Sequence, residues 1–118
     1  MFRYDYKGYW NSDAHCYLDI KRFPDKVVVI ATETGDNEGT SITNMAEHIA
    51  TQVCRDFDID PQSLVWIEHY DTESYRGANE ERDEYDLVTF DWNGRQFSKP
   101  KWKHLTRSEL YALIGEEV

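Results

Sequence analysis

An amphipathic segment at residues 43–57 lies between two apolar runs, and this order is the strongest constraint on the fold of the chain. Its apolar residues recur at the three- and four-residue spacing of a helix. The preceding run, KVVVIAT at 26–32, is rich in β-branched residues and is typical of a strand. SLVWIEHY at 63–70 has apolar residues on both strand faces near its start, as a central strand does. The three segments predict a β-α-β crossover between parallel strands.

Two further strands are predicted before this unit. AHCYLDIKRF at 14–23 alternates between apolar and polar residues, which indicates a half-buried strand. Pro24 and Asp25 favour a turn, so this strand forms a hairpin with residues 26–32. FRYDYKGYW at 2–10 is interpreted as an additional edge strand, with its glycine at a bend or bulge.

A second hairpin is predicted at residues 85–99. Asn93-Gly94 lies between two segments of high strand propensity, and this dipeptide favours a two-residue type I′ turn. A two-residue turn would place Phe90 opposite Phe97, as an aromatic cross-strand pair.

Both predicted helices carry terminal signals. Asn44 and Glu47 fit a capping box at the start of the long helix, although Ser41 and Thr43 also have capping side chains. TRSELYALIG at 106–115 predicts a short helix, which begins with a Thr-to-Glu capping box and ends at a glycine.

These elements predict an α+β fold in a single domain over residues 1–118. We expect a two-layer sandwich in which a mostly antiparallel sheet of about five to six strands carries one long and one short helix on one face. A chain of this length buries enough surface for one core without disulfides or metals.

The composition is acidic, with a net charge of −10. This charge disfavours direct binding to nucleic acid through a broad basic face and attachment to an anionic membrane. It suits a partner with a basic surface, and it also keeps a protein soluble. No segment has the length and apolarity of a signal-peptide core or a membrane span. Cys16 and Cys54 do not make a disulfide framework, so we expect a cytoplasmic protein with reduced thiols in its core.

The segment TETGDNEGTSITN at 32–44 joins a strand to a helix, as a phosphate-binding loop does. It has no lysine, and Glu33, Asp36 and Glu38 would repel a phosphate. Its spacing also differs from that of a calcium loop. The segment is therefore interpreted as an acidic connecting loop, and neither a metal nor a cofactor is predicted.

The candidate catalytic residues are Glu68, His69 and Asp71, at the end of the central strand. On a strand, Glu68 shares a face with Trp66 and Tyr70, whereas His69 shares the other face with Asp71. Asp71 would orient His69 as a general base. A small hydrolase-like enzyme or ligand-binding domain would use these residues together with the 33–41 loop, but no nucleophile is identifiable from sequence. The alternative is an ordinary strand end that meets solvent.

The leading functional hypothesis is a small, non-enzymatic interaction or regulatory protein. Its candidate partner-binding residues come from the acidic segment NEERDEYD, and they are Glu80, Glu81, Asp83 and Glu84. One version of this hypothesis is an inhibitor that mimics nucleic-acid charge and so binds a nucleic-acid-binding protein. The segment KPKWKH at 99–104 is a local basic and aromatic patch, interpreted as a loop that protects an edge strand or contacts phosphate.

A homodimer is a further possibility. Tyr and Trp are enriched at the centres of interfaces, and the first segment contains four of them: Tyr4, Tyr6, Tyr9 and Trp10. Core packing explains the same residues equally well.

Overall fold

The computed structural model describes residues 1–8, 13–33, 41–70 and 84–115. Within these ranges the chain forms one six-stranded sheet, two α-helices and a short 3₁₀ turn at Pro61–Ser63. The elements are, in chain order, β1 (Phe2–Lys7), β2 (Asp13–Arg22), β3 (Val27–Glu33), α1 (Ala46–Asp56), β4 (Leu64–Tyr70), β5 (Glu84–Trp92), β6 (Phe97–His104) and α2 (Arg107–Ile114).

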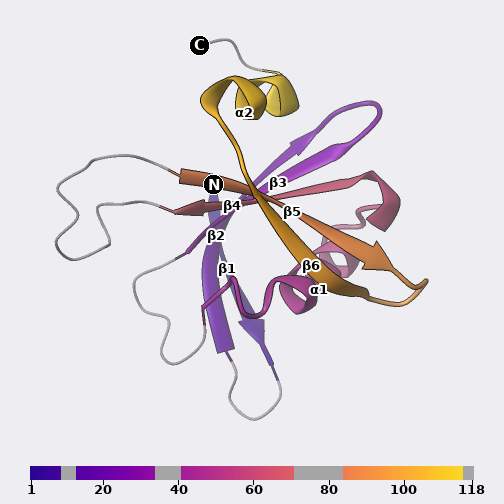
Figure 1. Cartoon of the computed structure of the whole chain (residues 1–118). Coiled ribbons are helices and arrows are strands. Elements are labelled where there is room, and N and C mark those ends of the chain that lie inside the picture. The colour runs from indigo at the N-terminus through magenta and orange to yellow at the C-terminus, as the bar shows by residue number, and fades with distance from the viewer. Residues whose placement is uncertain (9–12, 34–40, 71–83, 116–118) are drawn as a thin grey trace, which may run out of the picture.

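The strands lie side by side in the order in which they occur in the chain, from β1 to β6 (Figure 1). All neighbouring strands are antiparallel except β3 and β4, which are parallel and are joined by α1. The predicted α+β class, the mostly antiparallel sheet and the β-α-β crossover are therefore confirmed. The crossover brings the carboxyl ends of β3 and β4 to the same edge of the sheet.

The larger core lies between α1 and one face of the sheet. Val29 of β3 and Trp66 of β4 are almost completely buried on this face. Ile49 and Val53 of α1 pack in the same cluster, because they recur on one side of the helix. Burial of each such aliphatic side chain stabilises the fold by about 1.5 to 3 kcal/mol relative to exposure. This packing fixes the position of α1 over the parallel pair.

The second helix lies on the opposite face of the sheet, so the expectation that both helices share one face is wrong. Val28 and Ile67 form a separate buried cluster with Leu110 and Ile114 of α2. The physical reason is visible in the run of valines at 27–29, since consecutive strand residues point to opposite faces. A sheet that is apolar on both sides near its centre needs a cover on both sides.

The start of α1 also differs from the prediction. The helix begins after Met45, which occupies the N-cap position and makes no side-chain capping bond. The N-cap is therefore not Asn44, and the predicted Asn44–Glu47 capping box does not form. Residues 42–45 instead form a turn, in which the Asn44 amide donates to the Ser41 carbonyl at 3.2 Å. The side chain of Glu33, at the end of β3, accepts from the Ile42 amide at 3.1 Å. The Asn44 amide also donates to the Ser41 side chain at 3.3 Å, so Ser41 and Glu33 provide the side-chain acceptors in the segment before α1.

The turn between β5 and β6 is longer than predicted. Trp92 pairs with Phe97, so four residues connect the strands and Phe90 is not directly opposite Phe97. The side-chain oxygen of Asn93 accepts from the amides of Arg95 and Gln96, both at 2.9 Å. This side-chain bonding offers the backbone an alternative to the tight type I′ turn. The two phenylalanine rings still contact each other across the strands, with centroids 4.9 Å apart, although their residues are not paired.

The segment 99–104 is part of edge strand β6 and not a loop, which corrects the earlier interpretation. The pairing with β5 shifts between Thr89 and Asp91, and Lys99 has a φ of 50°. These features, with Pro100 beside them, are those of a β-bulge on the edge strand. A bulge, a proline and lysines on an edge discourage pairing with another chain.

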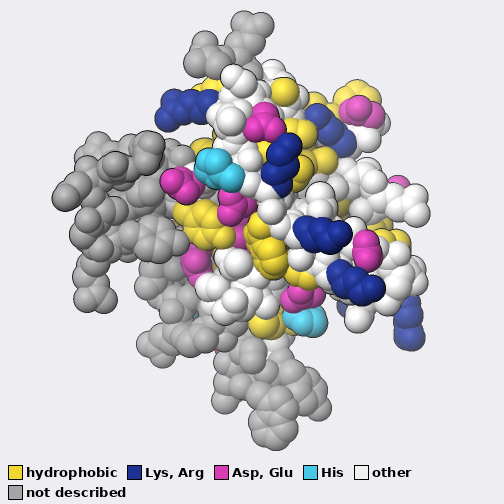
Figure 2. All heavy atoms as spheres, in the orientation of Figure 1, with side chains coloured by type: hydrophobic (Ala, Val, Ile, Leu, Met, Phe, Trp, Pro, Cys, Tyr) yellow, Lys and Arg dark blue, Asp and Glu magenta, His cyan; other side chains and the backbone are white. Residues whose placement is uncertain are grey.

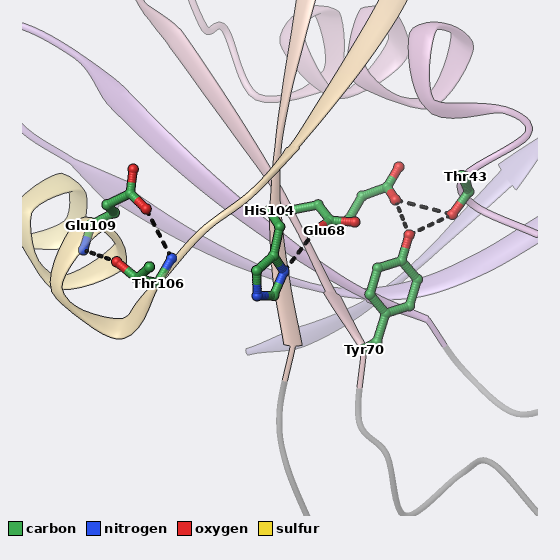
Figure 3. Close-up of polar contacts among 7 residues, drawn as sticks. Thr43, Glu68, Tyr70, His104, Thr106 and Glu109 are labelled. Atoms are coloured by element: carbon green, nitrogen blue, oxygen red, sulfur yellow. Dashed lines mark hydrogen bonds and ion pairs between the residues drawn. The ribbon is translucent and has the colours of Figure 1, made fainter.

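Both terminal signals of α2 are confirmed. Thr106 and Glu109 form a reciprocal capping box, with bonds of 3.1 and 3.2 Å (Figure 3). Gly115 ends the helix with a φ of 72°, a left-handed conformation that favours glycine. The box fixes the direction in which α2 leaves β6 and returns over the sheet.

Candidate functional site

The strand pairing brings residues from the two functional hypotheses onto one face of the sheet. Tyr70 pairs with Glu84, and Glu68 pairs with Asp86, between β4 and β5. Paired residues on antiparallel strands point to the same face. Trp102 of β6 also lies on this face, because its indole reaches Glu68. We refer to Glu68, Tyr70, Glu84, Asp86 and Trp102 as the acidic–aromatic face.

Glu68 is completely buried and is bonded by neutral groups (Figure 3). The Thr43 hydroxyl donates to its Oε2 atom at 3.0 Å, and the Tyr70 hydroxyl donates to the same atom. The indole N–H of Trp102 donates to Oε1 at 3.2 Å. Thr43 and Tyr70 also contact each other at 2.7 Å. Side chains from β4, β6 and the turn before α1 therefore converge on one carboxyl group.

Burial raises the pKa of Glu68 above its ordinary value of 4.5. The hydrogen bonds from Tyr70, Trp102 and Thr43 favour the charged form and oppose this increase, whereas the nearby charge of Asp86 adds to it. Burial and the bond to Glu68 also raise the pKa of Tyr70. No lysine or arginine among the described residues lies within ion-pair distance of Glu68. Since glutamate is almost never fully buried unless it is paired, this arrangement calls for an explanation.

Trp102 joins this buried carboxyl group to the surface. Its side chain is 42% exposed, and it is one of the large exposed hydrophobic residues of the described chain. The hydrogen bond to Glu68 holds the orientation of its ring. Figure 2 shows hydrophobic side chains beside Asp and Glu side chains at the centre of this view, with Lys and Arg side chains to the right of them. The exposed indole is thus a fixed feature of a mixed acidic and aromatic surface.

The acidic residues of the face become more exposed from Glu68 on β4 to the start of β5. Glu68 is buried, Asp86 is half-buried and Glu84 is exposed. Asp86 contacts Nδ1 of His104 at 3.3 Å, and this imidazole is itself largely exposed. Lys101 and Lys103 pair with Thr89 and Leu87, so they project from the opposite face of β6. The face therefore keeps a negative character beside the basic edge strand.

His69 lies on the other face of the sheet and does not meet Glu68. Its Nδ1 is 2.9 Å from the Thr32 hydroxyl on the parallel strand β3. Its ring stacks on Tyr85, with a centroid separation of 4.5 Å and an angle of 13° between the planes. Asp71, the predicted orienting group, lies outside the described residues. The structure thus pairs His69 with a hydroxyl that the local sequence did not indicate.

The remaining predicted residues are only partly described. Glu84 begins β5, whereas Glu80, Glu81 and Asp83 lie outside the described residues, as does the loop between Glu33 and Ser41. Tyr9 and Trp10 from the possible homodimer surface are also outside them, and Tyr6 is half-buried. Tyr4 is buried, and its hydroxyl donates to Asp56 at 2.6 Å, which ties β1 to the end of α1.

The two cysteines are core residues, as the sequence predicted. Both are buried and neither forms a disulfide. Burial raises the pKa of the Cys16 thiol to about 12 and that of the Cys54 thiol to about 11. Thiols with such pKa values are poor nucleophiles at neutral pH. Within the described part of the chain, no group of three or more His, Cys, Asp or Glu side chains is arranged to hold a metal ion.

Sequence reasoning did not connect Thr43 or Trp102 with Glu68. Thr43 was recognisable as a polar residue before the helix, and Trp102 as an aromatic residue between lysines. Their contacts depend on the strand order, which brings β6 within two strands of β4. No signal within a short window of sequence carries that information.

Comparison with known proteins adds no relative to this description. No protein-family model matches the sequence, and the searches of curated proteins and of solved structures also gave no match. Among the described residues, neither helix has the length and apolarity needed to span a membrane. The functional argument therefore depends on the acidic–aromatic face and on the residues around His69.

Proposed function

We propose that the chain is a small, non-enzymatic interaction domain that binds a basic protein partner through the acidic–aromatic face. The observation that supports this function best is the pairing of Trp102 with Glu68. An exposed indole is held by a buried carboxyl group, and burial of a carboxylate without a cationic partner lowers the stability of the fold. Such an arrangement is more easily explained by binding than by folding.

Trp102 would act as the anchor of the interface. Tryptophan, tyrosine and arginine dominate the binding energy of protein interfaces, and they are most effective in positions that exclude water. A side chain already fixed in its bound orientation loses less conformational freedom on association. The bond from Trp102 to Glu68 supplies this fixation, and Glu68 is accordingly a positioning residue because it is completely buried.

The charge of the face favours a cationic partner. Glu84 is exposed and Asp86 half-buried on this face, and the chain as a whole carries a charge of −10. Glu80, Glu81 and Asp83 precede Glu84 in the sequence, with Arg82 among them, and would extend the same acidic contact. A partner that normally binds nucleic acid has a suitable basic surface, so the chain would act on it as a charge mimic. We place this interaction in the cytoplasm, which is compatible with two buried, unpaired cysteines.

The substitution Glu84→Lys is expected to weaken binding of a short peptide of alternating lysine and arginine by about fivefold at low salt, which corresponds to about 1 kcal/mol. Glu84 is exposed and has no ion-pair partner among the described residues, so the change removes an attractive charge without breaking a contact. Fluorescence anisotropy of the labelled peptide measures the dissociation constant, and the difference should shrink as salt is added.

Asp91→Lys is the matched control for this measurement. Asp91 is also exposed and lies on the same strand, but at the opposite end from Glu84. The two variants have the same net charge, so a nonspecific effect of charge would weaken binding equally in both. Equal dissociation constants for Glu84→Lys and Asp91→Lys would contradict a local binding face.

A second candidate function, a small hydrolase, is favoured by the contact between His69 and Thr32. A hydroxyl 2.9 Å from an imidazole nitrogen is the geometry of a nucleophile beside its general base. In this mechanism His69 takes the proton of Thr32 as the oxygen attacks an acyl carbon, and the imidazolium then protonates the leaving group. A water molecule, deprotonated by His69, would then hydrolyse the acyl ester of Thr32 and release the acid. Asp71 would orient the imidazole, as the sequence suggested.

The hydrolase function predicts that the protein cleaves p-nitrophenyl acetate faster than buffer does, and that His69→Ala and Thr32→Val each abolish the excess rate. Release of p-nitrophenol is followed by absorbance, and circular dichroism checks that the variants remain folded. Thr89→Val provides a control, because Thr89 is an exposed hydroxyl residue on β5. Full activity in His69→Ala would exclude this mechanism.

A further inference from the structure

A cavity of about 300 Å³ lies between α2 and the sheet, on the face opposite the acidic–aromatic face. This volume is at the lower end of the range found for small-molecule sites, roughly 300 to 1,000 Å³. Part of its wall is apolar and is formed by Ile30 of β3 together with Leu110 and Ile114 of α2. The cavity exists because α2 is short and covers only part of this side of the sheet.

Two aromatic side chains make a second part of the wall. Tyr85 of β5 and Tyr111 of α2 both line the cavity. The plane of Tyr85 is set by its stacking on His69, with ring centroids 4.5 Å apart. A fixed aromatic wall beside aliphatic side chains favours a ligand with a flat apolar body.

The charged residues of the wall have an excess of positive charge. Asp19 and Lys21 form a pair at 3.7 Å, so their charges largely compensate. Arg107 is the remaining charged residue, and no carboxylate of the described chain lies within ion-pair distance of it. Its neighbour Glu109 is already bonded to Lys103 and to the cap of the helix.

The position of Arg107 is not explained by helix stability. It is the first residue of α2, where the helix dipole disfavours a positive side chain. A guanidinium group at this position can bind a carboxylate with two parallel hydrogen bonds, and the same dipole favours the incoming negative charge.

We propose that this cavity is a binding site for a small aromatic carboxylate, whose ring lies between Tyr85, Tyr111 and the apolar wall and whose carboxylate binds Arg107. The site is independent of the acidic–aromatic face, because it lies on the other side of the sheet and shares no residue with it. It shares only Tyr85 with the surroundings of His69.

Benzoate is a suitable probe, and benzyl alcohol is its neutral counterpart. A titration of the ¹⁵N-labelled protein with benzoate is expected to shift the amide signals of Ile30, Tyr85 and Tyr111 with a saturable curve. Arg107→Gln should weaken benzoate at least fivefold and leave the weak binding of benzyl alcohol unchanged. Arg95→Gln is the control, since Arg95 is an exposed arginine in the β5–β6 turn, away from the cavity.

Three results would overturn the proposal. Benzoate would shift no signal of the cavity residues at concentrations up to tens of millimolar, or it would bind Arg107→Gln and the wild type equally, or Arg95→Gln would weaken it as much as Arg107→Gln does. Because none of the substitutions touches Glu68, Glu84 or Trp102, failure of this site is distinguishable from failure of peptide binding.

Discussion

Replacement of Trp66 by alanine is expected to lower the free energy of unfolding by about 3 to 5 kcal/mol, the range measured for large aromatic residues in protein cores. Trp66 is 1% exposed in the central strand β4. It lies between Val29 of the parallel strand β3 and Val88 of the antiparallel strand β5. Its removal therefore leaves a cavity in the core beside both neighbouring strands. Because proteins are stable by only about 5 to 15 kcal/mol, this loss would remove a large fraction of the total stability.

Urea denaturation followed by far-ultraviolet circular dichroism measures this loss. Trp102→Ala is the matched variant, since it removes the same side chain from a position that is 42% exposed. We expect it to lose less than half as much stability, because Trp102 buries much less of its surface than Trp66 does and its removal leaves no enclosed cavity. A larger loss for Trp102→Ala than for Trp66→Ala would contradict the assignment of core and surface.

Replacement of Glu68 by glutamine is expected to stabilise the protein at pH 8 by about 1 to 2 kcal/mol, a gain within the range of single stabilising substitutions. Glutamine has nearly the same shape, and its amide can still bond Thr43, Tyr70 and Trp102. What it removes is a buried charge that has no cationic partner among the described residues. If the Glu68 carboxylate were needed for the fold, this substitution would instead lower the stability of the protein.

The gain should depend on pH in a defined direction. Burial raises the pKa of Glu68 in the folded chain, so its contribution to stability is fully present below the ordinary value of 4.5 and is lost as the pH rises through the raised value. Glutamine does not titrate, so the variant does not lose this stability as the pH rises. The two proteins should therefore be about equally stable near pH 4, and the variant should be more stable at higher pH.

Glu109→Gln should show the opposite pH dependence and is the control for this series. The cap of α2 and the nearby Lys103 lower the pKa of Glu109, so its contribution is present above its ordinary value and lost as the pH falls. Urea midpoints at several pH values distinguish the two directions. Destabilisation of Glu68→Gln at pH 8 would show that the carboxylate is needed for the fold itself.

Much of the fold followed from local patterns. Periodicity placed α1 over the core, and the order of strand, helix and strand predicted the parallel pair of β3 and β4. The capping box at Thr106 and the glycine at 115 were identified correctly, because these signals depend only on residues within one helix. Contacts that are local in sequence are the ones that sequence patterns describe.

Features that depend on long-range packing were missed. The turn at Asn93 is longer than the dipeptide suggested, because the Asn93 side chain bonds two amides of the turn. The position of α2 follows from the need to cover Val28 and Ile67, which could have been read from the consecutive valines. The convergence of Thr43, Tyr70 and Trp102 on Glu68 needed the strand order and could not be read from any one segment.

The most direct test of the proposed function is the indole N–H signal of Trp102 in a ¹H–¹⁵N spectrum during titration with the lysine- and arginine-rich peptide at low salt. This proton is bonded to Glu68, and its ring is exposed on the acidic–aromatic face. The account predicts that its signal shifts together with the amides of Glu84 and Asp86, while the buried indole of Trp66 stays in place. A peptide that leaves the Trp102 signal unchanged, or that shifts signals elsewhere instead, would contradict it.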